Sequence, residues 1–308
     1  MNKQKERLRS TRKTKQQKTQ IRWLAVLGIS LVLVAGLWTV LTNRQPENTS
    51  TRPISRLRTA DFHSLAFSPT ESQTIFFGHH DGLLVSRNGG KDWHPTTFSN
   101  ADAMALAAPP SNPQIMYAAG HEVFYKSTDA GKTWDTVTTD LPGLDIHGLT
   151  VDPTNADRVY AHVVGFGIFS SEDGGSKWTK LSDTVPPSSY NLAVGESSES
   201  LYVAAGQAGL WHSADGGRTW ARVDQSPDDG AVAGTYVRAN GRLYVTTLGN
   251  SAGLYVSDDQ GQTWTATGLK GTLLAIAISP LDPNYIVLVN DQGEVFASRD
   301  GGVTWSDM

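Results

Sequence analysis

Short apolar runs separated by polar turns recur along residues 60–308, and the pattern repeats every 41 to 44 residues. Each repeat unit holds four such runs, whose length is typical of β-strands. In the first unit they are His63–Phe67, Thr74–Gly78, Leu83–Val85 and Trp93–Thr97. Four short strands at this period describe one blade of a β-propeller, and residues 60–308 hold six such units. A solenoid of the same period would instead leave two open ends that need capping.

The turn between the third and fourth runs of every unit carries one eight-residue pattern, Ser-x-Asp-x-Gly-x-Thr-Trp, which we call the box. The copies are Ser86–Trp93, Ser127–Trp134, Ser171–Trp178, Ser213–Trp220, Ser257–Trp264 and Ser298–Trp305. The third residue can accept hydrogen bonds from amides of its own turn, glycine at the fifth allows a positive φ, and the Trp can pack between sheets.

We therefore assign a structural role to the third and eighth box residues. They are Asn88, Asp129, Asp173, Asp215, Asp259 and Asp300, with Trp93, Trp134, Trp178, Trp220, Trp264 and Trp305. In the first box Asn88 replaces Asp and Asp92 replaces Thr, and in the third box Lys177 replaces Thr. These copies should keep the turn with altered side-chain bonding.

The sixth unit ends early, because only Ser306–Met308 follow Trp305. A closed ring must take the missing fourth strand from elsewhere in the chain. Residues 44–59 read as a polar linker, except that Ile54–Thr59 alternates apolar and polar residues. We predict that Ile54–Thr59 closes the ring by pairing with the sixth blade.

Residues 1–22 carry nine Lys or Arg and one Glu, without an apolar period. We expect a disordered tail that faces the cytoplasm and attracts anionic lipid. No charged residue occurs in 23–43, whose apolar part, Trp23–Leu41, is 19 residues long. At about 1.5 Å per residue this nearly matches a hydrocarbon layer about 30 Å thick. We predict an uncleaved single-pass transmembrane helix in the cell membrane, since Ala35–Trp38 is a poor cleavage site for a signal peptide.

The charge differs between the two parts of the chain. The whole sequence has a net charge of −4, and the basic tail contributes +8, so the remainder carries −12. An acidic ectodomain argues against nucleic acid as a partner. The absence of cysteine excludes disulfides and thiolate metal ligands.

Histidine and aspartate gather at one end of the first three predicted blades. Strands alternate in direction, so the start of the first strand and the loop after the second share the face opposite the boxes. The candidate ligand-binding residues there are Asp61, Asp102, Asp145, His63, His79, His80, His121 and His147. Three interpretations remain open: a divalent metal site, a polar sugar site with Phe166 or Tyr190 as a stacking surface, or side chains that cap turns and bind water. No other cofactor is predicted.

The box resembles the Asp-box, or BNR repeat, of β-propeller proteins. Phrases such as Asp145–Pro153 and Gly78–Leu83 are similar to bacterial membrane-anchored BNR proteins that are labelled glycosyl hydrolases. The resemblance extends to sialidases, xyloglucan-cleaving glycoside hydrolases, sortilin-type receptors and photosystem II assembly factors. Sialidases carry an Arg-Ile-Pro motif, whereas Arg52–Ile54 reads Arg-Pro-Ile, and no arginine triad is evident.

The function expected from the sequence is that of a binding or assembly module. It would be held outside the cytoplasm and present the face opposite the boxes to a protein or a glycan. The alternative is a glycoside hydrolase of the Asp-box type. No residue pair has the specificity of a catalytic signature, and the sequence does not place two carboxyls at the separation that a glycosidase needs, so no catalytic residue is assigned.

Overall fold

The computed structural model describes residues 51–185, 191–224, 227, 232–237 and 241–305. The predicted tail and membrane helix of residues 1–43, and Tyr190, lie outside these residues. Across the described ranges, no helix combines the length and apolar character needed to cross a bilayer.

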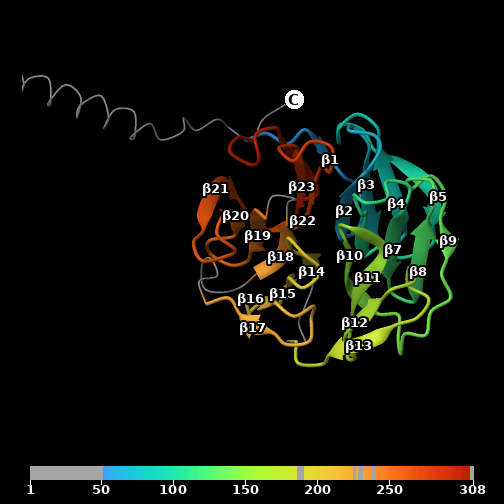
Figure 1. Ribbon diagram of the computed structural model, residues 1–308. Coiled ribbons are helices and arrows are strands. Elements are labelled where there is room, and N and C mark those ends of the chain that lie inside the picture. The colour runs from blue at the N-terminus through green and yellow to red at the C-terminus, as the bar shows by residue number, and fades with distance from the viewer. Residues whose placement is uncertain (1–50, 186–190, 225–226, 228–231, 238–240, 306–308) are drawn as a thin grey trace, which may run out of the picture. The chain divides into compact units, whose positions relative to one another are not determined.

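Six antiparallel four-stranded sheets make up the described part of the chain (Figure 1). Blade 1 holds β2 (Ser64–Phe67), β3 (Ile75–His79), β4 (Gly82–Ser86) and β5 (His94–Ser99); blade 2 holds β6 (Ala105–Ala107), β7 (Met116–Gly120), β8 (Val123–Ser127) and β9 (Asp135–Thr136). Blade 3 holds β10 (Ile146–Asp152), β11 (Asn155–Val163), β12 (Gly167–Ser171) and β13 (Thr179–Ser182); blade 4 holds β14 (Asn191–Val194), β15 (Leu201–Ala204), β16 (Leu210–Ser213) and β17 (Ala221–Arg222). Blade 5 holds β18 (Val232–Val237), β19 (Leu243–Thr247), β20 (Gly253–Ser257) and β21 (Thr265–Lys270); blade 6 holds β22 (Leu273–Ile278), β23 (Ile286–Asn290), β24 (Glu294–Ser298) and β1 (Ser55–Arg56).

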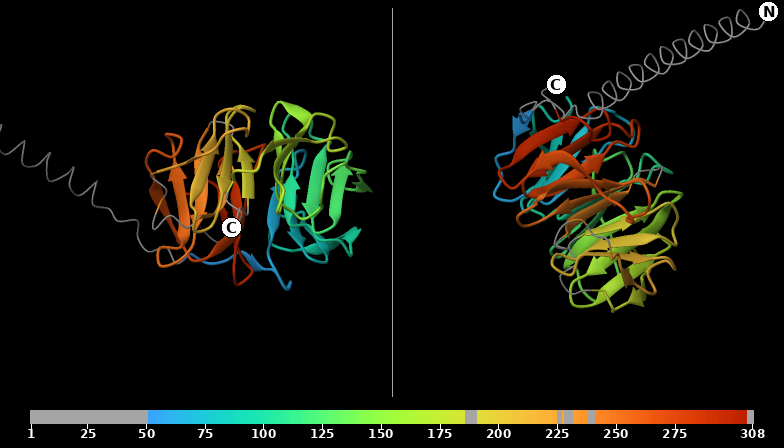
Figure 2. Two further views of the ribbon diagram at one scale, coloured as in Figure 1. Left: turned by 90° about the horizontal axis from the view of Figure 1, so that it is seen from below. Right: turned by 90° about the vertical axis from the view of Figure 1, so that its left-hand side faces the viewer.

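The first strands of the blades form the inner wall of a closed ring. Each contacts the first strand of the next blade, and β22 contacts β2. The six-bladed β-propeller predicted from the repeats is therefore confirmed, and Figure 2 shows the sheets standing side by side. A central channel of about 310 Å³ runs between the first strands, walled by apolar side chains such as Leu106, Leu149 and Ile276.

Strand β1 closes the ring, as predicted from the incomplete sixth unit. Ser55 pairs with Val295 and Arg56 with Glu294, so the N-terminal segment supplies the outer strand of the last blade. Figure 1 shows this blue segment beside the red strands of blade 6. The Leu57 side chain follows it into the core between blades 6 and 1, where it is only 4% exposed.

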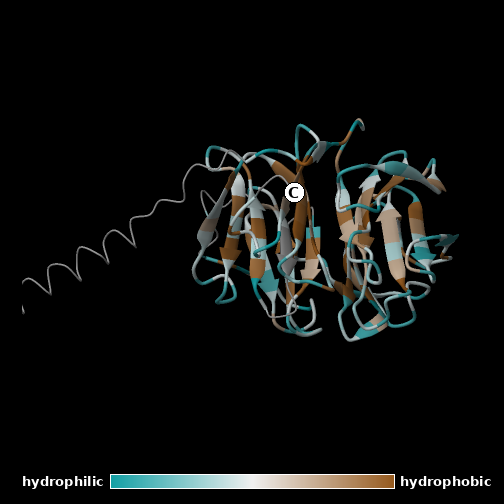
Figure 3. Cartoon of the chain, turned by 90° about the horizontal axis from the view of Figure 1, so that it is seen from above, coloured by the Kyte–Doolittle hydropathy of each residue, from teal (hydrophilic) through white to brown (hydrophobic). Residues whose placement is uncertain are grey.

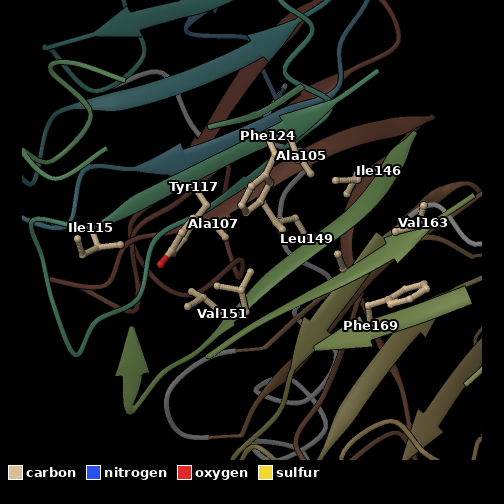
Figure 4. Packing of buried hydrophobic residues seen from close by; sticks show 13 residues of the cluster. Ala105, Ala107, Ile115, Tyr117, Phe124, Ile146, Leu149, Val151, Val163 and Phe169 are labelled. Atoms are coloured by element: carbon tan, nitrogen blue, oxygen red, sulfur yellow. The ribbon is translucent and has the colours of Figure 1, made fainter. Parts of the chain in front are cut away.

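Apolar side chains fill the spaces between neighbouring sheets. The second strands are buried almost throughout, whereas the outer strands are mostly exposed. Figure 3 shows the apolar residues along the strands and the polar ones in the loops. Between blades 2 and 3, Tyr117, Phe124, Ile146 and Phe169 pack into one of these cores (Figure 4). Burial of such side chains stabilises the fold by about 1.5–3 kcal/mol each.

The boxes hold their turns through one hydrogen-bond pattern. In all six, the serine Oγ accepts a bond from the amide of the fifth-position glycine at 2.8–2.9 Å. Where Asp and Thr are both present, as in Asp129 and Thr133, the carboxylate accepts the Thr amide and the Thr hydroxyl. In the first box Asn88 accepts the amide of Asp92 and donates to its carboxylate, so the exchanged residues compensate each other.

These hydrogen bonds make the stability of the propeller sensitive to acid. The side chain and amide of Thr263 hold the pKa of Asp259 at about 2, below the ordinary 3.8. A carboxyl with a lowered folded pKa stabilises the fold above about pH 4 and loses that contribution as the pH falls toward 2. We expect the difference in melting temperature between wild type and Asp259→Asn, measured from pH 2 to 7, to be largest above pH 4 and to vanish near pH 2. A difference independent of pH would contradict this account.

Candidate functional site

The register places the candidate residues at the end of each blade opposite its box. In blade 1, Ser64 at the start of β2 pairs with Gly78 near the end of β3, and Phe67 pairs with Ile75 at the box end. Asp61 and His63 precede β2, and the β3–β4 turn contains His80. The same arrangement brings Asp102 and Asp145 to this face, because each precedes the first strand of its own blade.

Seven of the eight candidate residues form one continuous line across blades 1 to 3, which we call the His/Asp array. Its members are Asp61, His63, His80, Asp102, His121, Asp145 and His147. They fall into three overlapping groups in which one ligand atom per residue lies within 4.8 Å of the others. Each group has three potential metal ligands, and neighbouring groups share one histidine.

At one end of the array, Asp61, His63 and His80 converge. The Asp61 carboxylate lies 2.5 Å from His80 Nδ1 and 3.3 Å from His63 Nε2. The two imidazoles approach to 3.0 Å through the same ring nitrogens. Asp61 also accepts the backbone amide of His80 at 3.0 Å, which fixes the turn that carries this histidine.

The charges at this end are unequal between the two rings. Burial would raise the pKa of Asp61, but hydrogen bonds from the His80 ring and amide lower it. Burial lowers the pKa of His63, while the hydrogen bond to Asp61 raises the pKa of His80. His80 therefore takes up a proton before His63 as the pH falls, and His63 is the neutral ring with an available lone pair.

The middle of the array is a buried carboxylate. Asp102 is 7% exposed, and its Oδ2 lies 2.7 Å from His121 Nδ1 and 3.8 Å from His80 Nε2. Its other oxygen, Oδ1, has no hydrogen-bond partner among the described residues. A buried carboxylate with an unpaired oxygen is costly unless positive charge lies close to it.

The other end of the array joins Asp145, His147 and His121. Asp145 Oδ1 lies 3.0 Å from His147 Nε2 and 3.4 Å from His121 Nε2. The 3.0 Å contact lacks hydrogen-bond geometry, and within the described ranges both atoms are buried without a hydrogen-bond partner. The turn here does not use the carboxylate, because Val164 donates to the backbone carbonyl of Asp145 at 2.9 Å.

His79 is the candidate that the structure places apart. It ends β3, stacks on Phe77 with ring centroids 6.1 Å apart, and accepts the amide of Asp81 at 3.3 Å. A further histidine, His162, lies inside β11 and is 3% exposed.

Two hollows adjoin the array. His63 and His147 border the mouth of the central channel. A depression of about 520 Å³ lies between blades 2 and 3, bordered by His121, Asp145 and Phe166, and the Phe166 ring is 44% exposed. The apolar wall of the channel was not predicted from the sequence. The one feature that could have indicated it is that first strands such as β22 carry apolar residues at consecutive positions, so that both faces of the strand are apolar.

Comparisons with known proteins agree with the architecture. The Sortilin-Vps10 family model (sortilin, neurotensin receptor 3) matches residues 208–308, about a third of the chain. Xyloglucanase Xgh74A of Acetivibrio thermocellus is 24% identical over 52% of this chain and 25% of its own length. The chain therefore spans about a quarter of that curated relative.

Solved structures of two kinds share the fold. The GH74 enzyme of Niastella koreensis superposes with a TM-score of 0.61 and 20% identity, over 83% of this chain and 46% of the enzyme. YCF48 bound to D1 peptide superposes with a TM-score of 0.55 and 18% identity, over 82% of this chain and 83% of that one. With one box in each of six blades, the chain has the fold of the Asp-box, or BNR-repeat, β-propellers.

Proposed function

We propose that this propeller is a binding module that presents the face carrying the His/Asp array to a protein or glycan ligand. The observation that carries the proposal is the array itself, a line of imidazoles and carboxylates across three blades beside an exposed aromatic ring. His80 and His121 expose about half of their side chains, 48% and 47%, so the polar groups are accessible. Phe166 offers an apolar face in the same depression as His121 and Asp145, a combination that suits a sugar ring or a peptide side chain.

The second candidate is a glycoside hydrolase, which the likeness to xyloglucanases favours. Such an enzyme needs one carboxyl with a raised pKa to protonate the leaving group, and a second carboxylate as base or nucleophile. The pKa of Asp61 is lowered, which is the wrong direction for the acid. We therefore prefer binding without hydrolysis, as in the structure of YCF48 with a bound peptide.

The membrane anchor belongs to the same proposal. An apolar helix in residues 23–43 would hold the propeller outside the cytoplasm, with the basic tail of residues 1–22 on the inner side. The part of residues 44–59 that precedes β1 would then act as the linker between the bilayer and the propeller.

A glycan panel tests the choice between the two candidates. The full chain is incubated with xyloglucan, other polysaccharides and sialosides, and both retention and newly formed reducing ends are measured. We expect retention of one glycan class without new reducing ends. Phe166→Ala should weaken retention about tenfold, because the ring supplies the stacking surface.

Val303→Ala is the matched control, since Val303 is 72% exposed but lies in the sixth box on the other face. Catalytic release of reducing ends by the wild type would establish the hydrolase instead. Retention that neither Phe166→Ala nor His80→Ala changes would remove this face as the binding surface.

A further inference from the structure

We propose that the His/Asp array binds two divalent transition-metal ions of the zinc class, one at each end, with Asp102 supporting both sites. The first site consists of Asp61, His63 and His80, and the second of Asp145, His147 and His121. This inference deepens the proposed function, because it concerns the same face, but metal binding is measured without any other ligand.

The spacing of the ligand atoms fits such ions. Zinc binds imidazole nitrogen and carboxylate oxygen at about 2.0–2.2 Å, so two ligands in a tetrahedral site lie about 3.3 Å apart. In the first site Asp61 Oδ1 lies 3.3 Å from His63 Nε2, and that nitrogen lies 3.0 Å from His80 Nδ1. The 2.5 Å hydrogen bond between Asp61 Oδ2 and His80 Nδ1 would open when the ion binds between them. In the second site Asp145 lies 3.0 Å and 3.4 Å from the two Nε2 atoms.

Hydrogen bonding alone does not account for the second site. The Asp145 and His147 atoms that face each other at 3.0 Å are buried and do not satisfy each other by a hydrogen bond. An ion bound between them would satisfy both. The turn does not need the carboxylate, since Val164 bonds to the Asp145 backbone instead.

Asp102 has the position of a carboxylate that orients metal-bound histidines. A ligating imidazole generally donates its other ring N–H to such a group. If His80 binds the first ion through Nδ1, its Nε2 faces Asp102; if His121 binds the second through Nε2, its Nδ1 faces Asp102. The buried carboxylate of Asp102 thus fixes the tautomer of one histidine ligand at each site. The positive charge of the two bound ions offsets the free-energy cost of burying this carboxylate.

The repeat explains why there are two sites rather than three. Blades 1 and 3 each carry Asp-x-His where the first strand begins, as Asp61 with His63 and Asp145 with His147. Blade 2 has Met104 in place of the histidine, so Asp102 has no partner two residues on. Each site supplies three protein ligands, which leaves a fourth position for water or for a ligand atom of the bound partner.

Zinc stoichiometry tests the inference. The full chain is stripped with chelator, equilibrated with micromolar zinc, freed of unbound metal by gel filtration and analysed for zinc. We expect two ions per chain in the wild type, one in His63→Ala, one in His147→Ala and none in the double variant. His79→Ala is the matched control and should keep two, because His79 lies apart from the array. Asp102→Asn should keep both sites with affinity lowered about 10–100-fold.

Asp61→Asn and Asp145→Asn repeat the test with side chains of unchanged shape, should either alanine variant fail to fold. Cobalt absorption gives a second readout, and its intensity should halve in each single variant. The inference is overturned if the wild type retains no zinc, if it retains one ion, or if the double variant retains as much as the wild type. None of these outcomes bears on glycan retention, so the proposed function stands or falls separately.

Discussion

Replacing Gly175 with alanine should lower the free energy of unfolding by about 2–5 kcal/mol. Gly175 is the fifth residue of the third box and has a φ of +99°, where an L-residue with a Cβ is strained. The added Cβ would also lie 2.1 Å from Cε1 of Phe124, which is buried in the core between blades 2 and 3. Denaturant unfolding of the full chain measures the loss.

Gly165→Ala separates the two causes of that loss. Gly165 has a φ of +78° in the same blade, but a Cβ there would meet nothing within 4 Å. Backbone strain alone should cost about 1–2 kcal/mol. Equal losses of unfolding free energy in both variants would show that the ring of Phe124 moves aside without destabilising the protein.

Leu57→Ala should destabilise the propeller by about 2–5 kcal/mol, although Leu57 lies outside the six repeat units. Its side chain is 4% exposed and packs with Leu65, Val289 and Val295, which belong to blades 1 and 6. The substitution leaves a cavity at the seam of the ring, next to the two residue pairs that close it. Thermal and denaturant unfolding report the change.

Leu281→Ala is the control of identical chemistry, because Leu281 is 52% exposed. It should change stability by less than about 0.5 kcal/mol. A Leu57→Ala loss no larger than this would mean that the seam contributes little to the stability of the ring.

The repeats predicted the fold well, because a blade is a local unit. Strand bounds such as Thr74–Gly78 differ from those observed by only one residue, since turn residues mark them directly. The closing strand was predicted from a deficit in the sixth blade, yet only Ser55–Arg56 of Ile54–Thr59 pair. The repeat period alone does not specify which side-chain contacts join one blade to the next. An example is the bond from the Tyr285 hydroxyl to the carbonyl of Gly89, across the seam.

The array could be predicted as a set, but not in its details. Position along the blade selects residues at one face, and this was enough to bring seven of the eight together. It does not say which of two consecutive histidines turns toward a neighbouring blade. His80 does so because Asp61 binds both its amide and its ring, whereas His79 still belongs to β3 and stacks on Phe77. The burial of Asp102 likewise depends on packing between blades.

The strand that closes the ring also sets an order of events during synthesis. The Arg56 side chain binds the carbonyl of Gln292, a residue 236 positions later. At a translation rate of about 5–20 residues per second, β1 leaves the ribosome roughly 12–47 s before its partner strand exists. Until then the nascent chain is an arc of blades, and the sheet face of blade 1 that packs against blade 6 in the closed ring is uncovered. Factors that protect nascent chains would therefore act on this propeller mainly before its last blade emerges.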